Sequence, residues 1–433
     1  MVFFSLRRLT CLTLAISPLL ALSPSGAQAQ APYIVVDAAT GQVLLEEEAT
    51  RPWNPASTTK MMTVFVALRA VKARQAQLDT PLVASARAAG QKPSKIGIRP
   101  GQEITLDNAI KIMMVKSAND LAYVIAEAIG GSVEGFSAMM NAEARRLGMT
   151  ESHFVNPHGF HAEGHQSSAR DLALLARALL TEFPEYQDYW SIGAVQLGNR
   201  VLNNTNGLLG RYPGADGMKT GFVCASGFNL VATANRGGRS LIVVVLGAGS
   251  GGERVLRSAQ LLDRGFGTWN RSGASLEALP RSSFAAAPNM RREICSGRRR
   301  GVVLSDDSDY GGSLLANTAA GESMAGGSAL AFFAGQNPQP AQQGFGGQPP
   351  GGRAVLGPRV AAVPIPVYLG RAPGSTAVAL APGGRRIAPA TALAGAPAPG
   401  LPASATALAP AAPPTLRGIV PGLEPRNDRP ASQ

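Results

Sequence analysis

The chain has 433 residues and a formal net charge of +12, with 50 glycines, 32 prolines and only 6% aromatic residues. The length allows two or three domains, but the uneven composition indicates that only part of the chain folds. The basic balance suits nucleic acid, acidic polymers or a charged membrane face. A soluble domain with a basic tail also explains the charge, and we favour that interpretation. We expect no nucleic-acid partner.

The N-terminus has the pattern of a secretory signal peptide. Arg7 and Arg8 precede an apolar run over residues 9–22, and the string AQA at residues 27–29 is a small-residue cleavage site. The run is too short for a good transmembrane helix. We therefore predict a signal peptide over residues 1–29 and an exported protein of the periplasm or cell envelope.

Hydrophobic periodicity then predicts helices between two groups of strands. In chain order the predicted elements are a hairpin over 33–47, a helix from near Ser57, helices over 106–130, 133–148 and 168–184, three strands within 216–249 and a closing helix over 253–266. Strands at both ends of a helical insertion favour an α/β (α+β) fold. We expect a mostly antiparallel sheet flanked by helices, with a separate helical lobe.

The composition changes beyond about residue 270. We predict a folded domain over residues 30–270, a poorly defined extension over 271–335 and a disordered tail over 336–433, rich in proline, alanine and glycine. Such a tail cannot bury enough apolar surface to offset its chain entropy. Within it, VPIPVYLG at residues 363–370 is a candidate docking segment.

Ser57 and Lys60 lie three residues apart at a predicted helix start, and therefore on one helix face. A serine hydroxyl is a poor nucleophile unless a base takes its proton, and a neutral amine can do this. Burial and nearby positive charge favour the neutral form of a lysine, and a helix N-terminus offers N–H groups to an oxyanion. Alone, S-x-x-K is a weak signal, since a capping serine and a solvated lysine share its spacing.

Two further motifs strengthen that signal. Ser117-Ala118-Asn119 lies in the predicted helix over 106–130, and Lys219-Thr220-Gly221 lies on a predicted strand. S-x-x-K, S-x-N and K-T-G in this order form the triple of penicillin-binding proteins and serine β-lactamases. We expect Ser57 to be the nucleophile and Lys60 the general base.

Each remaining residue of the triple has its own chemical reason. Ser117 can relay a proton to the leaving group, and Asn119 can bind a substrate amide and hold Lys60. Lys219 supplies a positive charge for a substrate carboxylate and helps to keep Lys60 neutral.

The strand residues after Lys219 complete the expected site. Thr220 adds a hydroxyl donor, and Gly221 lets the substrate backbone approach the strand edge. The N–H groups of Ser57 and Phe222 would be the two oxyanion donors.

With these motifs and their flanking strings, the chain resembles the low-molecular-mass D-alanyl-D-alanine carboxypeptidases, the serine penicillin-binding proteins of peptidase family S11. The resemblance covers about residues 31–267 and includes VVDAATGQVL, NPASTTKMMT, KSANDLA, HFVNPHGF, SARDLALLARAL, DGMKTGF and SGFNLVATA. It implies removal of the terminal D-alanine from peptidoglycan stem pentapeptides through an acyl-enzyme on Ser57, which β-lactams trap. It also implies a role in peptidoglycan maturation and cell shape, and no cofactor.

Arg254 is similar to the arginine that family members place beside K-T-G for the substrate carboxylate; a solvated surface arginine is the alternative. The resemblance ends after residue 267, where better-known members continue into a β-rich domain and an amphipathic membrane helix. Membrane association is therefore left open. The basic tail could instead hold the enzyme near anionic wall or membrane surfaces, which is a hypothesis.

Cys224 and Cys295 remain after the predicted cleavage. An oxidising compartment allows them to pair, so we hypothesise a disulfide that ties the segment around Cys295 to the main domain; two free thiols are the alternative.

All four histidines, His153, His158, His161 and His165, fall in one string and invite a metal hypothesis. Metal ligation needs three or four convergent ligands, and the string matches the serine family, so we expect no metal and a loop that shapes the edge of the site.

Other activities of the same fold stay open. A serine β-lactamase would need a loop glutamate that places water, and Glu163 lies in a plausible region but a different context. A D,D-endopeptidase would use the same acylation to cut cross-links. A non-catalytic wall-binding scaffold is disfavoured, because binding alone needs neither Ser57 nor Lys60.

Overall fold

The structure is a computed structural model that describes residues 31–268, 273–296 and 356–388. These residues belong to one compact unit, Met1–Pro389, and a second unit, Ala390–Gln433, lies outside them. The predicted signal peptide also lies outside the described residues. Within the described ranges, no helix combines the length and apolar character that crossing a membrane requires.

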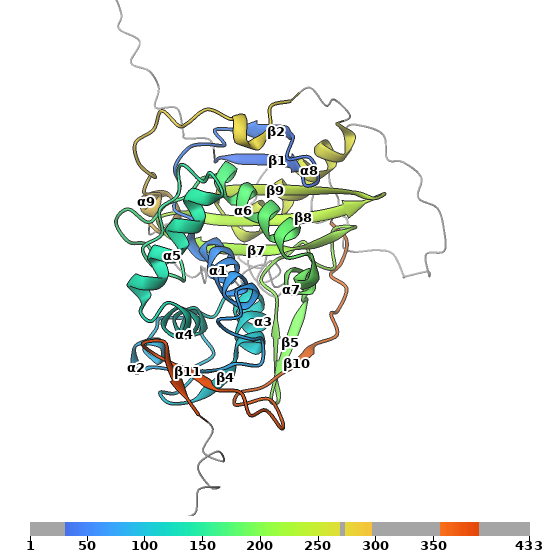
Figure 1. Cartoon of the computed structure of the whole chain (residues 1–433). Coiled ribbons are helices and arrows are strands. Elements are labelled where there is room, and N and C mark those ends of the chain that lie inside the picture. The colour runs from blue at the N-terminus through green and yellow to red at the C-terminus, as the bar shows by residue number, and fades with distance from the viewer. Residues whose placement is uncertain (1–30, 269–272, 297–355, 389–433) are drawn as a thin grey trace, which may run out of the picture. The chain divides into compact units, whose positions relative to one another are not determined.

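A five-stranded antiparallel sheet with the strand order β2-β1-β9-β8-β7 forms the centre of this unit (Figure 1). Its strands are β1 (Tyr33–Asp37), β2 (Val43–Glu47), β7 (Ala215–Val223), β8 (Gly227–Arg236) and β9 (Arg239–Ala248). The predicted hairpin and the three later strands are confirmed. Because β7 lies at one edge of the sheet, only one of its long sides pairs with a strand among the described residues.

Both faces of the sheet are buried, which explains the uninterrupted apolar run of β9. Ile242 and Val244 pack into a core shared with the helices, whereas Val243 and Val245 pack into a second core with Val255 of α8 (Gly251–Gly267). Successive residues of a strand point to opposite faces, so one apolar run serves two cores. On the first face, α6 (Ala169–Glu182) begins at Ser168, whose side chain caps the helix.

The helical lobe contains α1 (Lys60–Lys72), α2 (Ala86–Ala89), α3 (Leu106–Lys116), α4 (Asn119–Ile129) and α5 (Val133–Arg146). The prediction of one helix over 106–130 is wrong, because Ser117 adopts a left-handed conformation with φ +62° and Ala118 is extended. A non-glycine residue in this conformation is strained, and such strain is concentrated at functional sites.

The nucleophile segment also differs from the expected helix start. Ala56–Thr59 form a 3₁₀ turn, η1, and the α-helix begins only at Lys60. Ala56 has φ +49°, so the chain makes a sharp turn just before Ser57.

Two short strands of the helical part pair with the C-terminal segment 356–388. β10 (Ile365–Val367) adds in parallel to β5 (Ala194–Leu197), which pairs with β6 (Arg200–Asn203). The β-hairpin of β11 (Ala379–Ala381) and β12 (Arg385–Ile387) joins the sheet of β3 (Pro81–Val83) and β4 (Glu103–Thr105). Figure 1 shows this segment along the helical lobe.

The structure here differs from the predicted disordered tail, and VPIPVYLG does dock, through β10. Composition alone missed this because the segment builds no core of its own and uses sheet edges that the domain already offers. Val367 and Leu380 are buried in the main core, and Arg371 pairs with Glu103. The rest of residues 336–433 lies outside the described residues.

The remaining short elements connect these parts: η2 (Pro184–Tyr186), α7 (Asp188–Ser191), η3 (Leu276–Ala278) and α9 (Arg291–Cys295).

Candidate active site

Ser57 and Lys60 face each other as the spacing predicts. The Lys60 Nζ atom lies 3.0 Å from the Ser57 Oγ atom, and the lysine side chain is fully buried. The η1 turn places Ser57 one turn before the first residue of α1. A buried amine at this distance can exchange a proton directly with the hydroxyl.

Two carbonyl oxygens orient the Lys60 amine. Its Nζ donates to Asn119 Oδ1 at 2.7 Å and to the backbone oxygen of His158 at 2.8 Å. A neutral amine has two N–H groups and one lone pair. When both N–H groups go to these carbonyls, the lone pair can face the Ser57 hydroxyl.

The break between α3 and α4 brings Asn119 to Lys60. Asn119 is the first residue of α4, and its Nδ2 donates to the oxygen of Lys92 at 2.9 Å while its own N–H donates to Ser94. The buried Ser117 hydroxyl makes no hydrogen bond within the part of the chain that the structure describes. Because this hydroxyl has no partner there, it is available to hydrogen-bond with a bound substrate.

The buried carboxylate of Asp120 holds the loop that contacts Asn119. Asp120 accepts hydrogen bonds from the backbone N–H groups of Ile96, Gly97 and Ile98 at 2.9–3.2 Å. These bonds hold the loop over residues 92–98, whose carbonyls orient Asn119.

The edge strand β7 brings K-T-G against the nucleophile segment. A Cβ atom on Gly221 would lie 2.9 Å from both the oxygen of Pro55 and the nitrogen of Ser57. Any larger residue would push the strand away from the nucleophile, so glycine is required by this close approach. Lys219 and Thr220 are both buried, and Thr220 Oγ1 lies 2.6 Å from Thr205 Oγ1.

Arg254 lies behind β7 and β8. It is fully buried on α8, donates to the oxygen of Asn229 at 3.2 Å and stacks over the Phe228 ring. Asn229 pairs directly with Gly221, so the guanidinium lies one strand away from K-T-G. The alternative of a solvated surface arginine is therefore wrong. Phe222 packs its ring on Phe228 at 4.3 Å between centroids.

The histidine-rich loop, residues 153–165, binds to the start of α1. His165 Nε2 lies 2.9 Å from Thr59 Oγ1, and the Thr63 hydroxyl donates to the oxygen of Pro157. Within the described residues, no group of three or more histidine, cysteine or acidic side chains converges as a metal site would require. The loop supplies the His158 oxygen that accepts from Lys60, and Glu163 on it is exposed.

Burial keeps two of these imidazoles neutral. It lowers the pKa of His158 to about 2 and lowers the pKa of His165 to about 3. In the opposite sense, burial raises the pKa of Asp171 at the start of α6 to about 6, against the effect of its hydrogen bonds and of Arg170.

These shifts predict how stability changes with pH. Below the ordinary histidine pKa of 6.5, His158 and His165 bind protons in the unfolded state but stay neutral in the folded state. Each histidine therefore lowers the free energy of unfolding by about 1.4 kcal/mol for each pH unit that the pH falls. Asp171 has the opposite effect, because its carboxyl binds a proton in the folded state between pH 6 and 3.8. Over this range it offsets the loss of stability caused by about one of the two histidines. Urea unfolding at pH 4.5–6 measures this effect. The Asp171→Asn variant should lose free energy of unfolding more steeply than the unaltered protein as the pH falls, and an equal slope against pH would contradict the prediction.

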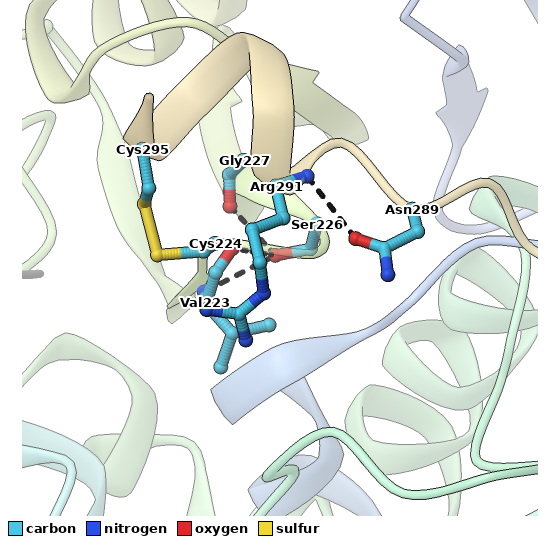
Figure 2. Close-up of a disulfide and its surroundings, with 7 residues drawn as sticks. All are labelled: Val223, Cys224, Ser226, Gly227, Asn289, Arg291 and Cys295. Atoms are coloured by element: carbon cyan, nitrogen blue, oxygen red, sulfur yellow. Dashed lines mark hydrogen bonds between the residues drawn. A yellow bond between two sulfur atoms is a disulfide. The ribbon is translucent and has the colours of Figure 1, made fainter. Parts of the chain in front are cut away.

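A disulfide joins Cys224, just after β7, to Cys295 in α9 (Figure 2). The hypothesised pairing is confirmed. It anchors residues 273–296, which we call the arm, beside the last residue of the K-T-G strand. The arm is also bound just before α9, since the N–H of Met290 donates to the oxygen of Ala225.

Sequence reasoning missed several residues of the site. The backbone oxygen of His158, the Thr205 hydroxyl and the side chains of Asn54 and Asn229 all contact the triple or its supporting loops. The His158 contact has no signal in the sequence, because a backbone carbonyl has no sequence signature. Asn54 had a weak signal, as a polar residue next to a motif.

The fold and the site define a class of protein. An antiparallel sheet, a helical lobe and S-x-x-K, S-x-N and K-T-G around one buried lysine are the arrangement of penicillin-binding proteins. A family model described as D-alanyl-D-alanine carboxypeptidase, Peptidase S11, matches residues 21–250. Because this match covers more than half of the chain, the chain belongs to that family.

Individual proteins agree with this assignment. The chain is 35% identical over 239 residues to the D-alanyl-D-alanine carboxypeptidase DacF of Bacillus subtilis, covering 54% of this chain and 61% of that protein. Its fold is similar to that of DacD from Francisella tularensis, with a TM-score of 0.53, 29% identity, and coverage of 56% of this chain and 72% of that one.

A cefotaxime-bound structure of penicillin-binding protein D2 from Listeria monocytogenes is similar with a TM-score of 0.50 and 30% identity. That likeness covers 54% of this chain and 96% of the other.

Proposed function

We propose that the chain is a serine D-alanyl-D-alanine carboxypeptidase that removes the terminal D-alanine from peptidoglycan stem pentapeptides and is acylated by β-lactams. The observation that carries this proposal is the buried Lys60 amine, 3.0 Å from Ser57 and held by Asn119 and His158. Family membership and the β-lactam-bound relative support it.

Acylation starts at Ser57. Lys60 takes the hydroxyl proton as Ser57 Oγ attacks the carbonyl carbon of the penultimate D-alanine. The N–H groups of Ser57 and Phe222 stabilise the oxyanion, and Ser117 passes the proton to the amine of the departing D-alanine. Water then hydrolyses the ester with Lys60 as base.

The K-T-G strand binds the substrate. Lys219 and the Thr220 hydroxyl take the terminal carboxylate, with Arg254 contributing positive charge from behind β8. Gly221 keeps β7 close to the nucleophile segment, so that a substrate backbone lying along β7 reaches Ser57.

We extend the proposal to location and partners. The N-terminal pattern, the disulfide and the family support an exported enzyme of the periplasm or cell envelope that acts on peptidoglycan during wall maturation and in cell shape. The mechanism needs no cofactor or metal.

Product analysis tests the proposal. The purified protein should release one D-alanine from an N-acylated stem pentapeptide and leave a tetrapeptide, and prior incubation with penicillin should block this. Faster cleavage of a cross-linked muropeptide dimer would identify an endopeptidase instead, and rapid penicillin turnover a β-lactamase. A protein that neither releases D-alanine nor retains penicillin would contradict the proposal.

A further inference from the structure

The two oxyanion donors come from different segments of the chain. Ser57 belongs to the η1 turn and Phe222 to β7, and the two segments touch where Gly221 faces Pro55 and Ser57. Their spacing decides whether both N–H groups reach one oxygen atom. Oxyanion stabilisation requires donors at about 2.7–3.1 Å from that atom, so small shifts reduce the rate.

Asn54 connects these segments. Its side chain is buried, and its Nδ2 donates to the oxygens of Ala225, at 3.3 Å, and Pro288, at 2.8 Å. Its Oδ1 lies 3.0 Å from His161 Nδ1. One amide three residues before the nucleophile therefore binds the β7–β8 turn, the arm and the histidine-rich loop together.

The neighbours of Asn54 add to this connection. The indole N–H of Trp53 donates to the oxygen of Ser226, and Asn229 Nδ2 donates to the oxygens of Asn54 and Pro55. Residues 53–55 are thereby bonded to the β7–β8 turn and to Asn229 of β8, which follows Phe228, the partner of Phe222 in the sheet.

The arm is bonded both to the β7–β8 turn and to Asn54. Figure 2 shows the disulfide linking Cys295 at the end of α9 to Cys224, with Ser226 hydrogen-bonded to Val223 and Gly227 in the same turn. The arm thus reaches the turn through a covalent bond and a backbone bond, and reaches Asn54 through Pro288. It lies beyond residue 250, where the family match ends.

We propose that Asn54 is a positioning residue for the oxyanion hole, and that the disulfide-anchored arm holds it in place. This inference rests on the proposed function. Asn54 touches no reacting atom; it fixes the β7–β8 turn, and with it Phe222, relative to the segment that carries Ser57.

The test measures how fast the full-length oxidised protein becomes acylated by a fluorescent penicillin. Asn54→Ala should lower the acylation rate constant by about 10- to 100-fold, while the final labelled fraction stays that of the unaltered protein. A merely structural role would lower the labelled fraction and the Tm and leave the rate constant unchanged. Asn54→Asp, which loses the two donated bonds but keeps the acceptor for His161, should also be slow.

The C224S/C295S double variant provides a second measurement, which also decides the question if Asn54→Ala does not fold. It should slow acylation in the same way. The matched control is Arg291→Gln, an exposed change on α9 whose side chain makes no hydrogen bond among the described residues, and its rate constant should equal that of the unaltered protein.

Unaltered acylation rate constants in both the Asn54 and the double cysteine variants would overturn the inference. A lack of any adduct in the unaltered protein would instead overturn the proposed function and the inference with it, and this is seen before any variant is compared.

Discussion

A Ser57→Ala variant is expected to form no covalent adduct with penicillin, whereas the unaltered protein gains the mass of one drug molecule. The acyl bond requires an oxygen that faces a base, and Ser57 Oγ alone lies beside the Lys60 amine among the hydroxyls of η1. Thr58 donates its hydroxyl to the oxygen of Pro55, and Thr59 binds His165. Intact mass spectrometry followed by peptide mapping measures the result.

Ser132→Ala is the matched control for this change. Ser132 caps the start of α5, so the variant loses about 1 kcal/mol of stability but keeps every contact of the site. It should acylate at the rate of the unaltered protein. An adduct in Ser57→Ala, or one that maps to another peptide, would show that Ser57 is not the nucleophile.

The second large effect concerns Lys60. Lys60→Ala and Lys60→Arg should each lower the acylation rate by at least about 10³-fold, since general-base catalysis contributes about 10²–10⁴-fold. Arginine keeps hydrogen-bond donors for Asn119 and His158 but cannot accept the serine proton. The arginine variant therefore separates the role of a base from that of a hydrogen-bond donor.

Lys72→Ala at the other end of α1 is the control for these variants. Its exposed amine donates to the oxygen of Glu182 and lies far along the helix from Ser57. Acylation should be unaffected there. A Lys60→Arg variant that acylates at the normal rate would assign proton removal to another group, and Tm measurements on every variant exclude loss of folding as the cause.

Much of the fold follows from local patterns. The hairpin of β1 and β2, the strands β7 to β9 and the helices α5, α6 and α8 lie where periodicity and turn residues predict them. These signals depend on neighbouring residues alone. The pairing of Cys224 with Cys295 could be hypothesised because the predicted export left only two cysteines.

Other features could not be predicted because they depend on contacts between distant segments. The apolar spacing over 106–130 continues through Ser117, so it hides the left-handed residue that divides α3 from α4. The burial of Arg254 depends on how α8 packs against β8. The strands at 365–367 and 379–381 exist only because β5 and β3 offer free edges.

By itself, the sequence determined the chemical groups of the site and their order, since a hydroxyl and an amine at helical spacing, S-x-N and K-T-G are each written in consecutive residues. Only the tertiary structure decided how those groups meet. The Lys60 amine is oriented by a side chain 59 residues away and a backbone oxygen 98 residues away. Such contacts require the packed lobe and sheet, because hydrogen-bond geometry is set in space and leaves no pattern in the chain.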